Sequence, residues 1–330
     1  MNRKVATTVA NPSSEFQRIA RIATILGQGR GPKIKLGIGD DAAIIRVGKE
    51  SLVWTTDSSV EEVHFRRELM SFGDVGWRSF NAAVSDVAAM GASPIAALSA
   101  IELPRSLRDR ELYELVEGQS AASKALKCPV AGGNLASAAK VSVTTSVLGR
   151  ASTPLLRSTA RPGDELWLIG SVGLAAAGLA CLTRSGSPLR GSDADYCVSS
   201  FRRPVARVTE GKRLQGRAHA AIDVSDGLAG DLGHIAKSSK VAVLVDERAL
   251  AGTLAPELLK VADKLGRPAM ELALFGGEDY ALLASGPRQK RPRFAEVIGE
   301  VTEGTGVWFI ALSGRRRRLG GAFDHFSRHA

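Results

Sequence analysis

The sequence has few cysteines and few aromatic residues, and both scarcities narrow what the protein can be. Its 330 residues include only Cys128, Cys181 and Cys197, an odd number, widely spaced and without a CxxC pair. This pattern argues against a disulfide framework or a zinc site and predicts structural cysteines. Aromatic residues make up 5% of the chain, and no basic stretch alternates with them. We therefore expect no nucleic-acid surface, although the formal net charge is +10.

Long hydrophobic runs are also missing. No apolar stretch reaches the length of a membrane span, and the first residues lack the apolar core of a secretory signal. We therefore expect a cytoplasmic protein without membrane contact. The basic run at 315–318 is interpreted as an exposed loop, and the spread positive charge would favour anionic substrates.

The order of sequence patterns predicts two domains of mixed strands and helices. Residues 1–14 are expected to form a flexible lead, and the segment 150–165, rich in Arg, Ser, Thr and Pro, is typical of a linker. The fold class is therefore α/β or α+β, with domains at 15–149 and 150–330. Strands are expected at 52–57, 95–104, 141–149, 166–170, 220–225, 241–246, 279–285 and 307–311, and helices at 74–91, 107–127, 171–183 and 226–238.

Acidic residues stand at strand ends and glycine-rich turns, where α/β proteins bind ligands. They are Asp40, Asp41, Asp57, Asp86, Asp223, Asp226, Glu278 and Asp279. Taken singly, Asp40 or Asp226 could simply form a turn or cap a helix. Asp86 fits that interpretation less well, because a carboxylate inside an Ala-rich helix needs a compensating partner. Converging carboxylates repel one another, and Mg²⁺, which takes oxygen ligands and shares them with phosphates, would relieve that repulsion.

This reasoning favours phosphoryl transfer, although the usual nucleotide motifs are missing. The sequence contains no GxxxxGK[ST] loop and no kinase-type GxGxxG before a Val-Ala-Ile-Lys strand. The residues by themselves thus predict magnesium and phosphates in an unusual fold.

Seven motifs in a fixed order carry a more specific signal. They are "GIGDDAAII", "TTDSSVEEVHF", "AAVSDVAAMGASP", "LLRSTARPGDELWLIG", "AIDVSDGLAGDLGHI", "FGGEDYALL" and the terminal "FDHF". From about residue 16 to 326, this order resembles the thiamine-monophosphate kinase family, part of the aminoimidazole-ribonucleotide-synthetase-like ATP-using superfamily. The resemblance implies an N-terminal domain that binds ATP and several Mg²⁺ and forms a homodimer through its sheet, followed by a C-terminal α/β domain. The implied reaction converts thiamine monophosphate and ATP to thiamine diphosphate and ADP.

The resemblance also implies site residues. The metal ligands would be Asp41, Thr55, Thr56, Asp57, Asp86, Asn134, Asp223 and Asp226. The ATP contacts would be Gly133, Asn134, Arg157 and Ser225. The thiamine phosphate contacts would be His64, Glu278 and Phe323, whose aromatic face suits a cationic thiazolium ring.

Two positions depart from the family pattern. "GGNLAS" has Asn134 where the family usually has an Asp, so one negative charge is lost although an amide oxygen can still coordinate Mg²⁺. "GGAFDHF" changes the spacing before the terminal aromatic, which makes Phe323 the weakest of these assignments.

The implied chemistry needs no general base. A phosphate monoester has a second pKa of about 6 and is already largely dianionic near neutrality. The obstacle is the approach of two polyanions, which Mg²⁺ and Arg157 would offset by stabilising the charge of the transferred group. His234 is interpreted as an ordinary helix residue, because it lacks the spacing of metal ligands.

Three alternatives stay open at this point. One is another enzyme of the superfamily, acting on an amidine, a selenide or a carbamoyl group. The chain has no Cys before Cys128, which speaks against selenide chemistry, and it does not end in a Cys as a hydrogenase-maturation relative would. The second is a non-catalytic nucleotide-binding paralogue, favoured only by Asn134. The third is a nucleic-acid binder, favoured only by the net charge.

Overall fold

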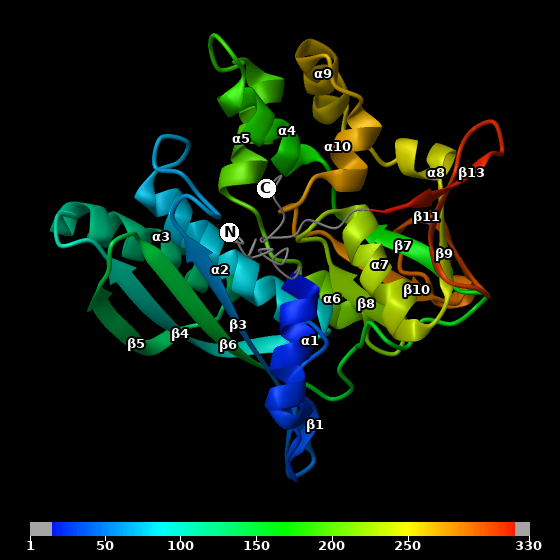
Figure 1. Ribbon diagram of the computed structural model, residues 1–330, viewed down its shortest axis with the longest axis horizontal. Helices are drawn as coiled ribbons and strands as arrows, with labels where there is room; N and C mark the ends of the chain where they lie inside the picture. The colour runs from blue at the N-terminus through cyan, green and yellow to red at the C-terminus, as the bar shows by residue number, and fades with distance from the viewer. Residues whose placement is uncertain (1–14, 321–330) are drawn as a thin grey trace, which may run out of the picture.

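Two β-sheets with helices against them make up the protein, which is represented by a computed structural model (Figure 1). The structure describes residues 15–320, so the expected flexible lead and Phe323 lie outside the described residues. The mixed fold predicted from the sequence is confirmed. None of the described helices is long and apolar enough to cross a membrane.

The first half forms a six-stranded sheet with the order β1-β2-β3-β6-β4-β5. Helix α1 (Glu15–Ile25) and the 3-10 turn η1 (Gly27–Gly29) precede it. The strands are β1 (Ile34–Leu36), β2 (Ala43–Val47), β3 (Glu50–Val60), β4 (Ser93–Leu103), β5 (Val130–Ser137) and β6 (Ser142–Ala151). Helices α2 (Phe72–Ala89) and α3 (Asp109–Leu126) cover one face. Within residues 15–320 the opposite face is open and exposes Trp54 and Leu98.

The second half forms a seven-stranded sheet with the order β13-β12-β9-β11-β7-β10-β8. Its strands are β7 (Glu165–Ile169), β8 (Ala220–Asp223), β9 (Ala242–Asp246), β10 (Leu282–Gly286), β11 (Glu296–Thr302), β12 (Gly306–Ile310) and β13 (Arg316–Leu319). Its helices are α4 (Leu174–Thr183), α5 (Ser192–Arg202), α6 (Val208–Leu214), α7 (Leu228–Ser239), α8 (Glu247–Ala251), α9 (Pro256–Leu265) and α10 (Ala269–Phe275), with the 3-10 turn η2 (Arg288–Lys290) after β10. In Figure 1 the strands of this sheet lie on the right, and α4, α5 and α9 lie at the top.

Helix α2 joins the two halves. It begins with a capping box in which the Ser71 hydroxyl accepts the Asp74 N–H and the Asp74 carboxylate accepts the Ser71 N–H. Small residues let it approach its neighbours closely: a Cβ on Gly118 of α3 would lie 2.0 Å from the Gly73 carbonyl oxygen. The helix contacts α3, β3 and β6 of the first half and β8 and α6 of the second half. Side chains of α2 therefore reach the boundary between the halves.

The structure corrects the expected loop at 315–318 and the expected strand end at Asp57, since β3 continues to Val60. The arginines at 315–318 are exposed as expected, but Arg316 to Arg318 belong to edge strand β13 rather than to a loop. Charged side chains on an edge strand discourage pairing with other chains. Helix α7 begins at Leu228 with Gly227 as its N-cap, so Asp226 lies in the preceding turn and does not cap the helix. The three cysteines are buried and free, as expected.

Candidate active site

A cavity of about 580 Å³ lies between the two halves, a volume typical of a small-molecule site. From the first half it is lined by polar side chains of β3, α2 and the loop after β3, and from the second half by the turns after β8 and before β10. The lining includes Thr56, Asp57, His64, Phe65, Asp86, Phe201, Asp223, Ser225, Asp226 and Glu278. Eight of the residues singled out from the sequence thus line one cavity: Thr56, Asp57, His64, Asp86, Asp223, Ser225, Asp226 and Glu278.

Asp41, Asp86 and Asp223 form a group that we call the acidic cluster. They come from the turn before β2, from helix α2 and from the end of β8, yet each offers a carboxylate oxygen within 4.8 Å of the others. Burial raises the pKa of Asp41 and Asp86 well above the ordinary value, and the neighbouring carboxylates raise the pKa of both groups further. Burial raises the pKa of Asp223 to about 6. Within residues 15–320, Asp41 Oδ2 is buried and has no hydrogen-bond partner. The cluster therefore has the donor set and the unmet charge of a site for a divalent cation.

Hydroxyl groups orient two of these carboxylates. Thr55 Oγ1 donates to Asp86 Oδ2 at 2.5 Å and also lies 3.3 Å from the Asp41 carbonyl oxygen. Ser85 Oγ donates to Asp223 Oδ2 at 2.6 Å across the boundary between the halves. The sequence did not single out Ser85. This residue belongs to the "VSD" at 84–86, a motif that recurs at 224–226.

Arg157 contacts the two aspartates of "GIGDD". Its Nε lies 3.2 Å from Asp40 Oδ1, its backbone N–H donates to Asp40 Oδ2 at 3.3 Å, and its Nη2 donates to Asp41. Asp40 thus does more than shape its own turn, because it anchors the arginine both by side chain and by backbone. Arg157 partly neutralises the acidic cluster, because its positive charge acts to lower the pKa of Asp41 and Asp223.

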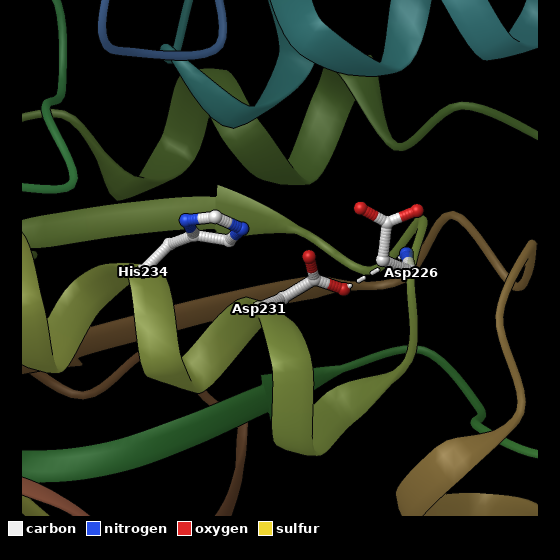
Figure 2. A group of neighbouring side chains, drawn as sticks. All are labelled: Asp226, Asp231 and His234. Atoms are coloured by element: carbon white, nitrogen blue, oxygen red, sulfur yellow. Dashed lines mark hydrogen bonds between the residues drawn. The ribbon is translucent and has the colours of Figure 1, made fainter. Parts of the chain in front are cut away.

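The turn between β8 and α7 carries Ser225 and Asp226 (Figure 2). The buried Asp231 carboxylate, from the first turn of α7, accepts the N–H groups of both residues. Asp226, Asp231 and His234 each place a possible ligand atom within 4.8 Å of the others. Burial raises the pKa of Asp231 well above its ordinary value and lowers that of His234 to about 4, so this imidazole is neutral near pH 7. The sequence singled out neither Asp231 nor the proximity of His234 to Asp226.

His64 and Glu278 line the same cavity. His64 Nδ1 accepts the Val60 N–H at 3.1 Å, which fixes the orientation of the ring. The Glu278 carboxylate forms a salt bridge with Arg78, a buried residue two turns before Asp86 on α2. The Arg78 guanidinium also donates to the Phe201 carbonyl and lies 4.7 Å from the centroid of the Phe201 ring. Arg78 was missed from the sequence, and its charge on the apolar face of α2 is the signal that could have found it.

Gly133 and Asn134 lie apart from these groups. Both belong to the exposed edge strand β5 and neither lines the cavity. Through the strand register, Ser58 pairs with Thr144, Thr144 with Ala100 and Ala100 with Asn134. Three strand spacings place Asn134 about 14 Å from β3. Asn134 also shares the sheet face of Ser58, opposite to that of Asp57, so a single chain does not bring it to the acidic cluster.

Both halves of the chain match family models of one class. Residues 39–151 match the N-terminal domain of AIR synthase related proteins, and residues 161–310 match their C-terminal domain. The two sheets and the cavity between them are therefore the framework of an AIR synthase related protein.

Similarity to individual proteins narrows this class. The chain is 34% identical to the thiamine-monophosphate kinase of Aquifex aeolicus over 273 residues, which cover 82% of this chain and 88% of that protein. It is 33% identical to the Escherichia coli K12 protein of the same name over 305 residues, 87% of each. The solved structure "AaThiL complexed with AMPPCP and TMP" has a TM-score of 0.87 and 32% identity, covering 94% of this chain and 97% of that chain. The chain belongs to the thiamine-monophosphate kinase family.

Proposed function

We propose that this protein transfers a phosphoryl group from ATP to thiamine monophosphate, giving thiamine diphosphate and ADP. The observation that carries the proposal is the acidic cluster, of which Asp86 and Asp223 line one cavity between the halves together with His64 and Glu278. A related chain of the same fold has been solved as a complex with AMPPCP and TMP, which supports binding of a nucleotide and thiamine monophosphate to this framework. Family membership over most of the chain gives further support.

The acidic cluster would hold Mg²⁺, with Asp57, Asp226, Thr55 and Thr56 as further ligands. The unpartnered Asp41 oxygen and the three converging carboxylates support this assignment, because oxygen ligands of this kind suit Mg²⁺. Bound Mg²⁺ supplies positive charge that offsets the repulsion between phosphates. The aspartates hold that charge in place, and the hydroxyls of Thr55 and Ser85 keep two of the carboxylates oriented.

The protein's own residues would align the reactants without removing a proton. The acceptor phosphate, with a second pKa of about 6, attacks as a dianion. Arg157, anchored by Asp40, would stabilise the charge that spreads over the transferred group, and Ser225 would contact ATP. His64 and Glu278 would contact the thiamine phosphate, and the ion pair with Arg78 keeps Glu278 in place.

We further propose that the protein acts as a homodimer of chains in which residues 15–149 bind ATP and magnesium and dimerise, while 150–330 form the second domain. The side chains of Trp54 and Leu98, each 51% exposed, share the open face of the six-stranded sheet with Asn134. Covering this face with a second copy would bury apolar surface. It would also bring Gly133 and Asn134 of one chain toward its partner.

The decisive experiment is a turnover assay. Purified protein given ATP, Mg²⁺ and thiamine monophosphate should release thiamine diphosphate and ADP in equal amounts. Failure to form thiamine diphosphate across a full magnesium titration would overturn the proposed function. Sedimentation of the natural chain beside Leu98→Glu tests the dimer separately, since a charge on the open face should yield monomers only if that face is the interface.

A further inference from the structure

The carboxylate of Asp231 reaches backward out of its own helix. Asp231 stands in the first turn of α7, and its side chain is only 2% exposed. Its own N–H donates to the Gly227 carbonyl, so its backbone follows the ordinary helical pattern. Its Oδ2 instead accepts the N–H of Ser225 at 3.1 Å and the N–H of Asp226 at 3.2 Å. Figure 2 shows the Asp231 carboxylate beside Asp226, with the hydrogen bond from the Asp226 N–H as a dashed line.

The same turn is held from its other side by the loop that carries Glu278. The Ser225 carbonyl accepts the Glu278 N–H at 2.8 Å, and the Val224 carbonyl accepts the Tyr280 N–H at 2.9 Å. Contact here is tight, because a Cβ on Gly277 would lie 2.4 Å from the Ser225 carbonyl oxygen. Ser225 is thus fixed at its N–H by Asp231 and at its carbonyl by the loop, so a shift at one contact moves the other.

We propose that Asp231 is a positioning residue, whose carboxylate fixes the turn of Ser225 and Asp226 and, through the Ser225 carbonyl, the loop of Glu278. The inference rests on the proposed function, in which Ser225 contacts ATP and Asp226 holds magnesium. Burying a carboxylate close to Asp226 is unfavourable unless hydrogen bonds offset the lost hydration. The N–H groups of Ser225 and Asp226 supply those bonds. As a result, the turn that carries these two residues has one defined conformation.

Three variants test the proposal through binding of Mg²⁺-AMPPCP, measured by calorimetry, together with KM and kcat. Asp231→Ala removes both acceptor contacts and should weaken binding about tenfold or more, because the turn is no longer pre-organised. Asp231→Asn keeps a carbonyl oxygen that can accept the same N–H groups and should bind within about threefold of the natural chain. Equal binding by the natural chain and Asp231→Ala, or equal losses in Asp231→Ala and Asp231→Asn, would overturn the proposal.

A longer side chain covers the case in which Asp231→Ala does not fold. Asp231→Glu keeps the charge but moves the carboxylate by one methylene, so it should also weaken nucleotide binding by several-fold. Unchanged binding in that variant would contradict a positioning role. The calorimetric measurement needs no turnover, so a natural chain that binds Mg²⁺-AMPPCP but phosphorylates nothing would refute the proposed reaction while still allowing the variants to be compared.

Asp164 offers the matched control. It is 3% exposed, and its Oδ2 accepts the Arg161 N–H at 3.0 Å and the Ser285 hydroxyl at 3.1 Å, but it does not line the cavity. Asp164→Ala should lower the melting temperature as Asp231→Ala does, and leave Mg²⁺-AMPPCP affinity unchanged. If Asp164→Ala weakens nucleotide binding equally, the effect of Asp231 is general destabilisation and the proposal fails.

Discussion

Two sets of largely buried aspartates in this protein have different surroundings. Asp231 and Asp279 have partners supplied by the backbone: the Asp279 carboxylate accepts the N–H of Gly173 at 2.6 Å and that of Ala175 at 2.9 Å, at the start of α4. In the acidic cluster, Asp86 accepts a hydrogen bond from the Thr55 hydroxyl, and Asp41 Oδ2 has no hydrogen-bond partner within residues 15–320. Burial raises the pKa in both sets. Only the second set keeps an unmet demand for positive charge.

The difference teaches how to distinguish structural from ligand-binding carboxylates. A buried carboxylate that accepts backbone N–H groups has its hydration replaced by the fold itself. Carboxylates that face one another lack such replacement, so folding leaves their mutual repulsion in place until a cation arrives. Carboxylates bound by backbone N–H groups should therefore matter chiefly for stability or positioning. Carboxylates that face one another should matter for activity and should lower stability.

The largest effect should come from Asp86→Asn. The amide keeps the shape and can still accept from Thr55, but it removes one charge from the acidic cluster, so kcat should fall about a thousandfold. Removing a repelled charge should at the same time raise the melting temperature of the metal-free protein. Turnover assays and thermal unfolding in a chelator measure the two changes. If Asp86→Asn is inactive and also less stable than the natural chain, the acidic cluster does not lower the stability of the metal-free protein.

The acidic cluster should also make the metal-free protein less stable at higher pH. Burial raises the pKa of Asp223 to about 6, above the ordinary 3.8, so the folded protein binds more protons than the unfolded chain in this window. The free energy of unfolding should therefore fall as pH rises from about 4 to 6. Mg²⁺ competes with protons for the cluster, so it should raise the melting temperature more at about pH 8 than at about pH 5. If the melting temperature in chelator rises with pH over this range, the acidic cluster does not destabilise the metal-free protein at higher pH.

Replacing a backbone-bound aspartate should give the opposite balance. Asp279→Ala leaves the N–H groups of Gly173 and Ala175 without their acceptor, which should lower the free energy of unfolding by about 1–3 kcal/mol. Its kcat at a temperature where the variant is folded should fall far less than that of Asp86→Asn. Urea unfolding beside turnover measurements tests both expectations. A kcat loss as large as that of Asp86→Asn would place Asp279 with the acidic cluster.

Local sequence patterns were sufficient to predict part of this site. The Ala-rich pattern at 74–91 predicts α2 and the unusual place of Asp86 within it, and the predicted strand end at Asp223 is confirmed. The predicted strand end at Asp57 is wrong, because β3 continues to Val60. The confirmed features depend on the neighbours of each residue along the chain. For that reason periodicity and turn chemistry could locate them.

Other parts of the site depend on contacts that no local pattern encodes. The ion pair of Arg78 and Glu278 joins residues two hundred positions apart, and the backward reach of Asp231 depends on where its helix begins. The order β3-β6-β4-β5 inserts two strands between Asp57 and Asn134. A single sequence does not reveal strand order, so the family resemblance could suggest Asn134 as a ligand without showing that it lies on the open face.

The smallest effect is expected at this exposed edge. Asn134→Asp adds one carboxylate to β5, and it should lower the Mg²⁺ concentration for half-maximal rate by about two- to fivefold if a partner's edge strand completes the site. Asn134→Ala is the matched control and should raise that concentration. Because Asn134 is exposed and lies about 14 Å from β3 in the single chain, neither change should alter the melting temperature of the metal-free protein by more than about one degree. An unchanged Mg²⁺ requirement in both variants would confine metal binding to the buried aspartates of one chain.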